Sequence, residues 1–419
     1  MRKYKINGRA SLQGNVRISG AKNAALPILT STILLSGESV IRNIPRLNDV
    51  ITIIRVLRTL GVKAEYSESE PNTVRVLTPP KIKHVAPYEL VTKMRASFFV
   101  LGPILARTGL AKVPLPGGCA IGSRPVNLHL HGLRNLGAEI EFEHGFVIAK
   151  AKKLIGSTIH FDVPSVGATE NILMAAVLAE GETTLENAAK EPEIVDLANF
   201  LNSAGAKITG MGTETIKIKG VESLYGIEYK IIPDRIEAGT YMIAAAITGG
   251  EISVKEVFPE HLESLIHKLK TAGVKVSIDG NSIKVKSNSH LKAVDIRTLP
   301  YPGFPTDMQP QFSTLMAVAE GTSVINESVF ENRFMFINEL KRMGANIRVE
   351  NQSAIICGVE KLSSAPVRVS DLRAGAALLI AGLASSGETM IEDQERQIER
   401  GYEDICEKLR EMGAEIEVL

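Results

Sequence analysis

One cysteine lies in a segment that is rich in chain-breaking residues. From Pro114 to Pro125 the sequence is Pro-Leu-Pro-Gly-Gly-Cys-Ala-Ile-Gly-Ser-Arg-Pro. Prolines and glycines at this density interrupt helices and central strands, so the segment predicts a loop. Cys119 stands in it with Arg124 five residues on, and an accessible thiol beside a cation has a lowered pKa and reacts as a thiolate. A lone cysteine is more often a small apolar residue packed under a loop, so the rest of the chain must decide.

Short polar segments precede six apolar runs that have helical spacing. A helix N-terminus attracts anions through its free N–H groups and its dipole. Taken singly, each segment is typical of an N-cap with a solvated charge. Together with arginines elsewhere they predict a cationic cleft and a small ligand with several negative charges. The segments are residues 19–23, 93–97, 165–169, 233–235, 304–307 and 370–373, and the cations are Lys22, Arg95, Arg235, Arg373, Arg124, Arg333 and Arg400.

These segments recur because the chain is built from six repeats. Each repeat ends in an apolar helical pattern, a glycine and an alternating run, which predicts a helix, a left-handed glycine cap and a strand. The glycines are Gly61, Gly137, Gly205, Gly273, Gly344 and Gly413, spaced 76, 68, 68, 71 and 69 residues apart. A second glycine lies upstream in every copy: Gly37, Gly109, Gly181, Gly250, Gly321 and Gly387. Each copy is therefore predicted as a strand–helix–strand–helix–strand unit of the α/β class.

The second copy departs from this pattern. Where the other five copies continue from the upstream glycine into a strand, residues 110–125 are predicted as a mobile loop that replaces the strand and turn. An insertion that overrides a local pattern is more often functional than structural. The six copies also divide into two halves of three, with a hinge predicted between Tyr225 and Asp234, and two such domains can enclose a substrate in a cleft.

Composition limits the class of protein. The chain has 419 residues and a net charge of +1, which gives no bulk attraction to nucleic acid or to a membrane surface. Three cysteines, Cys119, Cys357 and Cys406, argue against a disulfide framework and favour a cytoplasmic location. No signal peptide or membrane span is predicted. The histidines lack ligand spacing, and no dinucleotide-binding glycine motif follows a strand, so neither a metal nor another cofactor is expected.

Over essentially its whole length the chain resembles the enolpyruvyl transferases, in particular those that act on UDP-N-acetylglucosamine at the start of peptidoglycan synthesis. The resemblance rests on residues 19–27, 94–97, 115–125, 165–169, 191–196, 305–309, 330–333, 371–373 and 400–402. It implies an inside-out α/β barrel architecture of two domains with three repeats each, and an active site in the cleft between them. The implied domains are residues 21–232, and residues 1–20 together with 233–419.

The resemblance also implies roles for individual residues. Cys119 would be the proton donor that forms an adduct with phosphoenolpyruvate, and Asp307 would lie near the reacting hydroxyl. Lys22 and Asn23 would meet phosphoenolpyruvate, Arg95 the nucleotide-sugar, and Val329 the sugar through its backbone. The uridine diphosphate site would comprise Arg124, Pro125, Val126, Asn127, Leu128, Ser165, Val166 and Gly167. The phosphoenolpyruvate carboxylate and phosphate would be held by Arg333, Arg373 and Arg400. Two departures from the family are Val163-Pro164, where some members have a lysine, and Asn127, where others carry aspartate.

Such a reaction needs a base at the hydroxyl, an acid at C3 of phosphoenolpyruvate and cations around the leaving phosphate. Asp307 suits the first role, Cys119 the second, and Lys22, Arg124 and Arg400 the third. An epoxide such as fosfomycin would then alkylate Cys119 in preference to Cys357 or Cys406. The rival predictions are the related transferase that makes 5-enolpyruvylshikimate 3-phosphate, and a nucleotide-sugar sensor without activity on the same fold.

Overall fold

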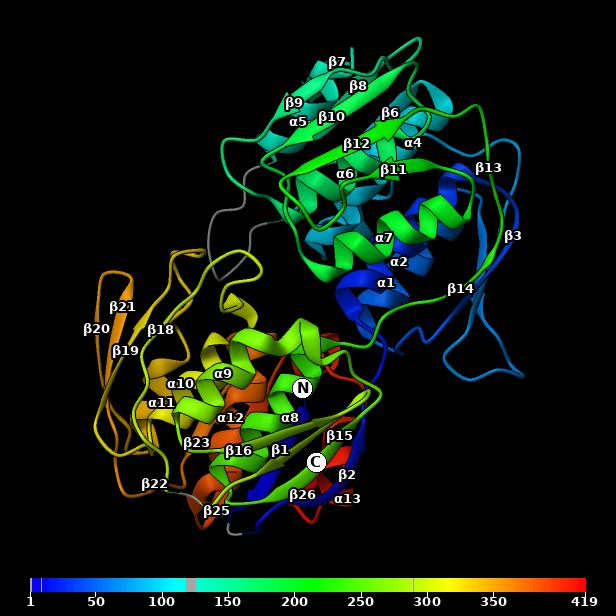
Figure 1. Cartoon of the computed structure of the whole chain (residues 1–419). Coiled ribbons are helices and arrows are strands. Elements are labelled where there is room, and N and C mark those ends of the chain that lie inside the picture. Colours follow the sequence, from blue (N-terminus) through cyan, green and yellow to red (C-terminus); the bar gives the residue numbers. More distant parts are fainter. Residues whose placement is uncertain (1, 9, 118–125, 289) are drawn as a thin grey trace. The chain divides into compact units, whose positions relative to one another are not determined.

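The structure is a computed structural model that describes residues 2–8, 10–117, 126–288 and 290–419. The chain forms two compact units, each with its own hydrophobic core. Among the described residues, the first unit comprises residues 20–117 and 126–232, and the second comprises residues 2–8, 10–19, 233–288 and 290–419. Within each unit of Figure 1 the sheets lie around a centre of buried helices.

The first unit holds three sheets. One has the order β13–β3–β5–β4, with β14 also paired to β3; the others are β6–β8–β7 and β11–β12–β10–β9. The strands are β3 (Leu35–Arg42), β4 (Lys63–Tyr66), β5 (Val74–Thr78), β6 (Leu110–Pro114), β7 (Glu139–Glu143), β8 (Phe146–Lys150), β9 (Thr158–His160), β10 (Glu182–Glu186), β11 (Lys207–Thr209), β12 (Thr215–Lys219), β13 (Leu224–Tyr225) and β14 (Glu228–Lys230).

The helices of the first unit differ in burial. They are α1 (Lys22–Ser31), η1 (Thr32–Leu34), α2 (Asn48–Thr59), α3 (Tyr88–Val91), η2 (Arg95–Val100), α4 (Leu101–Thr108), α5 (Asn127–Asn135), α6 (Val166–Ala176) and α7 (Pro192–Ser203). Nearly every residue of α1 and α6 is buried. A helix that is apolar all round has to be covered on every side, which explains its central place.

The second unit has the same plan. Its main sheets have the orders β16–β17–β15–β2, β18–β19–β21–β20 and β23–β25–β1–β26, and β22 pairs with β24. The strands are β1 (Arg2–Asn7), β2 (Gln13–Arg17), β15 (Glu251–Lys255), β16 (Lys275–Asp279), β17 (Ser282–Lys286), β18 (Ile296–Arg297), β19 (Thr322–Asn326), β20 (Asn346–Glu350), β21 (Ser353–Cys357), β22 (Leu362–Ser363), β23 (Pro366–Arg368), β24 (Ser385–Ser386), β25 (Glu388–Asp393) and β26 (Glu415–Val418).

Three long buried helices, α8, α10 and α12, contact one another at its centre. The helices are α8 (Arg235–Ile247), η3 (Pro259–Leu262), α9 (Glu263–Thr271), η4 (Thr306–Met308), α10 (Gln309–Met316), α11 (Ile337–Arg342), α12 (Leu372–Ala384), η5 (Ile398–Arg400) and α13 (Ile405–Glu411). Among the described residues, no helix is long and apolar enough to span a membrane.

The six predicted helix–glycine–strand endings are confirmed. Gly61, Gly137, Gly205, Gly273, Gly344 and Gly413 all have positive φ, between 87° and 107°. Each follows a helix (α2, α5, α7, α9, α11 or α13) and precedes a strand (β4, β7, β11, β16, β20 or β26). A side chain with a Cβ atom is strained at such φ values, so glycine is required here.

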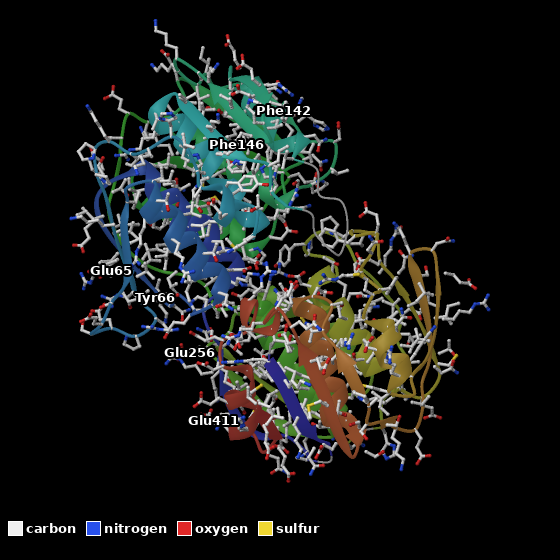
Figure 2. All side chains as sticks on the ribbon, turned by 180° about the vertical axis from the view of Figure 1, so that it is seen from behind. Glu65, Tyr66, Phe142, Phe146, Glu256 and Glu411 are labelled. Atoms are coloured by element: carbon white, nitrogen blue, oxygen red, sulfur yellow. The ribbon has the colours of Figure 1, made fainter. Side chains whose placement is uncertain are left out.

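The prediction for the second copy is wrong in one respect. Residues 110–114 are not part of a loop but form β6, which pairs antiparallel with β8 and brings Pro114 opposite Phe146. Proline is tolerated because it stands at the end of the strand, where the missing N–H costs little. Phe142 and Phe146, labelled in Figure 2, lie on β7 and β8 of this sheet. Strand β6 therefore extends to Pro114, and residues 115–117 after it are in neither a helix nor a strand.

Three repeats contain strands from distant parts of the chain. β1 inserts between β25 and β26, and β2 pairs in parallel with β15, so residues 2–17 belong to the sheets of the second unit. β14, inside the segment predicted as a hinge, runs parallel to β3 in the first unit. Each borrowed strand supplies the pairing that a sheet edge would otherwise lack.

Candidate active site

The six polar segments do lie at helix starts, as predicted. Ser165, Asp234 and Asp371 are the N-caps of α6, α8 and α12. Asp234 Oδ1 accepts hydrogen bonds from the N–H groups of Ile236 (2.8 Å) and Glu237 (3.0 Å). Asp371 Oδ1 accepts from the N–H groups of Arg373 (3.0 Å) and Ala374 (3.1 Å). The short helices η2 and η4 begin within the segments that contain Arg95 and Asp307.

In the second unit the structure brings together three of the predicted residues. Asp307 Oδ1 lies 3.1 Å from Arg333 Nη2, and its Oδ2 lies 2.9 Å from Arg373 Nη2. Both arginine side chains are 2% exposed, whereas that of Asp307 is 27% exposed. The carboxylate is thus held by two buried guanidinium groups while one side of it reaches the surface of the unit.

Buried neighbours fix the position of Arg373. Its Cζ lies 5.2 Å from the ring centroid of Tyr402, a cation–π distance. The Tyr402 hydroxyl accepts a hydrogen bond from Gln311 Nε2 (2.9 Å) and lies 3.1 Å from Thr240 Oγ1. Burial lowers the pKa of Arg373, but Asp307, Tyr402 and Asp234 together raise it by more, so the net pKa is raised. Arg373 therefore stays charged.

The remaining predicted residues of the second unit make other contacts. Arg400 is on η5, and its Nη1 donates to Gln397 Oε1 at 2.9 Å. Arg235 begins α8 and lies over the ring of Tyr301, 5.6 Å from its centroid. Val329 follows β19, and its N–H donates to Glu327 Oε1 at 2.9 Å.

In the first unit Lys22 is the first residue of α1, and it is paired. Its Nζ lies 2.7 Å from Asp49 Oδ2, and both side chains are buried. Asn23 follows on the same helix. A Cβ at Gly20 would lie 1.6 Å from the carbonyl oxygen of Asn43, so only glycine fits where the chain enters α1. Asp49 was not predicted as part of the site, because an aspartate in the first turn of a helix reads as an ordinary N-terminal charge.

The segments predicted for the nucleotide converge in the first unit. Val126 is the N-cap of α5, which begins at Asn127 and Leu128, and Ser165–Gly167 begin α6. A Cβ at Gly167 would lie 3.3 Å from the ring of His129, so these two helix starts touch. His129 is buried, and burial together with the charge of Arg95 lowers its pKa to about 3. Asn171 Nδ2 donates a hydrogen bond to Nδ1 of neutral His129 at 3.0 Å, and this bond fixes α5 against α6.

Cys119, Arg124 and Pro125 lie outside the described residues, so their predicted roles stay predictions. The chain before them is anchored, because the Leu115 N–H donates to the Gly145 carbonyl at 2.9 Å. Of the other two cysteines, Cys406 is on α13, and burial raises its pKa to about 11. Cys357 is half-buried at the end of β21. A raised pKa makes Cys406 a poor nucleophile at neutral pH.

Carboxylates offset the predicted positive charge within each unit. Lys22, Arg333 and Arg373 are paired with Asp49 or Asp307, and Arg333 Nη1 lies 3.9 Å from Asp371 Oδ1. The prediction counted only the cations, so the local charge is less positive than expected. In the described ranges no three His, Cys, Asp or Glu side chains are placed to hold a metal ion.

The family profile described as EPSP synthase (3-phosphoshikimate 1-carboxyvinyltransferase) matches residues 6–409. The chain therefore belongs to this family of carboxyvinyl transferases, and it is an enzyme. Among solved structures it is similar to the enolpyruvyl transferase NikO from Streptomyces tendae, with a TM-score of 0.89 and 26% identity over 100% of this chain and 99% of that one. It shares the fold of EPSP synthase from Acinetobacter baumannii, with a TM-score of 0.76 and 20% identity over 100% of both chains.

Within this family the chain has curated relatives of nearly equal length. It is 56% identical to UDP-N-acetylglucosamine 1-carboxyvinyltransferase 2 of Carboxydothermus hydrogenoformans, over 100% of this chain and 99% of the relative. It is 54% identical to UDP-N-acetylglucosamine 1-carboxyvinyltransferase 1 of Caldanaerobacter subterraneus subsp. tengcongensis, over 99% of both chains. The predicted enolpyruvyl transferase family and two-domain α/β fold are confirmed.

Proposed function

We propose that the chain transfers the enolpyruvyl group of phosphoenolpyruvate to the 3-hydroxyl of UDP-N-acetylglucosamine and releases phosphate, the first committed step of peptidoglycan synthesis. The observation that carries this proposal is the 56% identity, over the whole chain, to a relative named for carboxyvinyl transfer to UDP-N-acetylglucosamine. The likeness to EPSP synthases at 20% identity supports the fold alone. The substrates are small molecules of the cytoplasm, and we propose that compartment for the protein.

The proposed reaction is an addition followed by an elimination. The sugar oxygen bonds to C2 of phosphoenolpyruvate, its proton leaves to a base, and C3 gains a proton to become a methyl group. The resulting ketal then loses phosphate, and the methyl group gives up a proton to restore the double bond. The first step needs a base and an acid, and both steps need cations that stabilise the phosphate.

In this proposal Asp307 is the base at the sugar hydroxyl, and Arg333 and Arg373 receive the carboxylate of phosphoenolpyruvate. The two ion pairs at Asp307 support this assignment, since they place the carboxylate beside buried guanidinium groups. Once the substrate carboxylate shares these arginines, their hold on Asp307 weakens and its basicity increases. Lys22, Arg124 and Arg400 bind the phosphate, Asn23 assists them, and Cys119 protonates C3.

The other proposed contacts concern the nucleotide-sugar. Arg95 lies within electrostatic range of His129, at the place where α5 and α6 start. That arrangement supports a uridine diphosphate site made of Arg124, Pro125, Val126, Asn127, Leu128, Ser165, Val166 and Gly167. Val329 contacts the sugar through its backbone.

The experiment is phosphate release by the purified chain from phosphoenolpyruvate, with either UDP-N-acetylglucosamine or shikimate 3-phosphate as acceptor. We expect release with the nucleotide-sugar and only background with shikimate 3-phosphate. Release with shikimate 3-phosphate alone would assign the chain to the shikimate reaction instead. Binding of UDP-N-acetylglucosamine without release would make it a sensor.

The role of Cys119 has a separate test. Fosfomycin is an epoxide that resembles phosphoenolpyruvate, and we expect it to alkylate Cys119 faster when UDP-N-acetylglucosamine is bound. Peptide mass spectrometry locates the label. Cys119→Asp should keep turnover and lose fosfomycin sensitivity because a carboxylic acid still donates a proton, whereas Cys119→Ser should lose most turnover. Label on Cys357 or Cys406 with loss of activity would contradict the assignment.

A further inference from the structure

Glu327 is a buried carboxylate that the sequence did not single out. It follows β19 and is 1% exposed. Its Oε1 accepts hydrogen bonds from Thr298 Oγ1 (2.8 Å), Val329 N (2.9 Å) and Phe330 N (3.2 Å). Its Oε2 accepts from Thr306 Oγ1 at 3.0 Å. These four hydrogen bonds satisfy both oxygens of the buried carboxylate.

These donors come from three separate segments. Thr298 follows β18, Thr306 stands directly before Asp307 on η4, and Val329 and Phe330 begin the turn that leads to Arg333. The segments are also tied to one another, because the Ser328 N–H donates to Thr298 Oγ1 at 2.9 Å. Arg333 Nη2 donates to the Thr306 carbonyl at 3.2 Å. Glu327 therefore holds together the backbone on both sides of the Asp307–Arg333 ion pair.

We propose that Glu327 is a positioning residue for the sugar end of the reaction, which fixes the Asp307 turn and the Val329 turn in one arrangement. This inference rests on the proposed function. Because the N–H of Val329 donates to Glu327, the carbonyl oxygen of Val329 is the backbone group that would contact the sugar. Glu327 orients that carbonyl by accepting hydrogen bonds from the N–H groups on either side of it in the chain, those of Val329 and Phe330.

The chemistry of the site explains why substitutions here should differ in effect. Two backbone N–H groups can only donate, so they need an acceptor, whereas the Thr306 hydroxyl can either donate or accept. Glutamine could keep its Oε1 toward Val329, Phe330 and Thr298 and turn its amide nitrogen toward Thr306. Alanine would leave two part-buried N–H groups without their acceptor, and both turns could then shift. Glutamine should therefore rescue most of what alanine loses.

The test compares Glu327→Ala with Glu327→Gln, using steady-state kinetics for both substrates and thermal unfolding. For Glu327→Ala we expect kcat/KM for UDP-N-acetylglucosamine to fall on the order of 100-fold, as for an active-site group displaced by about 1 Å. KM for phosphoenolpyruvate should change less, because only its carboxylate is proposed to meet Arg333, and Lys22, Arg124 and Arg400 are proposed to hold its phosphate. Glu327→Gln should stay within about tenfold of the unsubstituted chain, the equivalent of one weakened hydrogen bond.

A second pair of variants keeps the inference testable if Glu327→Ala fails to fold. Thr306→Val removes one of the four donors, and Thr314→Val is its control, since the buried Thr314 hydroxyl donates only to the Pro310 carbonyl within α10. We expect Thr306→Val to raise KM for UDP-N-acetylglucosamine, and Thr306→Ser and Thr314→Val to leave it unchanged.

The outcomes separate the inference from the proposed function. Absence of turnover on UDP-N-acetylglucosamine by the unsubstituted chain would contradict the proposed function. If the unsubstituted chain turns over normally and Glu327→Ala or Thr306→Val is equally active, the proposed role of Glu327 is overturned and the proposed function stands. Equal impairment of Glu327→Gln and Glu327→Ala at equal thermal stability would also overturn it, because a positioning role requires the rescue.

Discussion

The central helix starts of the two units are held in different ways. In the second unit, aspartate side chains cap α8 and α12, and Asp307 joins Arg333 and Arg373 in a connected buried network. In the first unit, α1 has Ala21 at its N-cap and no side-chain cap, with Lys22 as its first residue. Carboxylates at a helix start occupy its N–H groups and repel anions, whereas an uncapped start beside a lysine attracts them.

This difference suggests a division of labour between two units that share one repeat. The first unit is suited to binding phosphate groups through helix starts and Lys22. The second unit is suited to holding a base and two guanidinium groups in a fixed geometry. Both rest on the same glycine-capped repeats, so the chemistry differs through a few polar residues placed on a common scaffold.

The largest effect should come from the network of the second unit. Asp307→Asn keeps a hydrogen-bonding group between Arg333 and Arg373 but cannot take up a proton. Turnover should fall by about 10²- to 10⁴-fold, the usual contribution of a general base. Measured kcat with both substrates saturating checks this, and Asp279→Asn on exposed strand β16 is the control. A fall of less than threefold would mean that the base is another group.

The next effect concerns Lys22 and separates binding from stability. Lys22→Ala should lower kcat/KM for phosphoenolpyruvate about 100-fold, because a preorganised cation at the phosphate is lost. It also leaves Asp49 buried without its partner, which should lower the free energy of unfolding by about 3–5 kcal/mol. The double variant Lys22→Ala/Asp49→Ala should recover stability without recovering activity. Recovery of both would show that Lys22 serves the fold alone.

The smallest effect is a difference in pH dependence between the units. Burial raises the pKa of Asp196 on α7 from 3.8 to about 6, and that of Glu237 on α8 from 4.5 to about 7 against the opposing charge of Lys408. A raised carboxyl pKa gives stability that is complete below the unfolded value and is lost as pH rises through the folded value. For Asp196 this loss amounts to about 3 kcal/mol of the free energy of unfolding.

Substitution by the neutral amide should remove each dependence. The melting temperature of Asp196→Asn, relative to the unsubstituted chain, should rise between pH 4 and about 6 and then level off. For Glu237→Gln the same rise should extend to about pH 7. Thermal unfolding across this range measures both, and a flat difference would show that the carboxyl group titrates normally in the fold.

Local sequence signals predicted much of the fold. The glycine caps and the six helix starts depend on residues adjacent in the chain, and the resemblance supplied the roles predicted for individual residues. The sequence could not reveal contacts that join distant residues. Examples are the insertion of β1 between β25 and β26, and the pairing of Lys22 with Asp49.

The burial of polar side chains also could not be predicted from the sequence. Glu327 reads as an ordinary surface glutamate, and only the fold shows that it is buried with four donors around it. The strand β6 was missed because Pro114 was weighed as a breaker rather than as a strand end. The roles of Cys119, Arg124 and Pro125 rest on the resemblance.

The central claim is addition and elimination at C2 of phosphoenolpyruvate with UDP-N-acetylglucosamine as acceptor. Mass spectrometry of the nucleotide product formed in deuterium oxide tests it most directly. We predict a product that carries an added enolpyruvyl group with deuterium in its terminal CH₂, because C3 passes through a methyl group. An unchanged nucleotide-sugar, or one that has gained a phosphoryl group while pyruvate is released, would contradict the account.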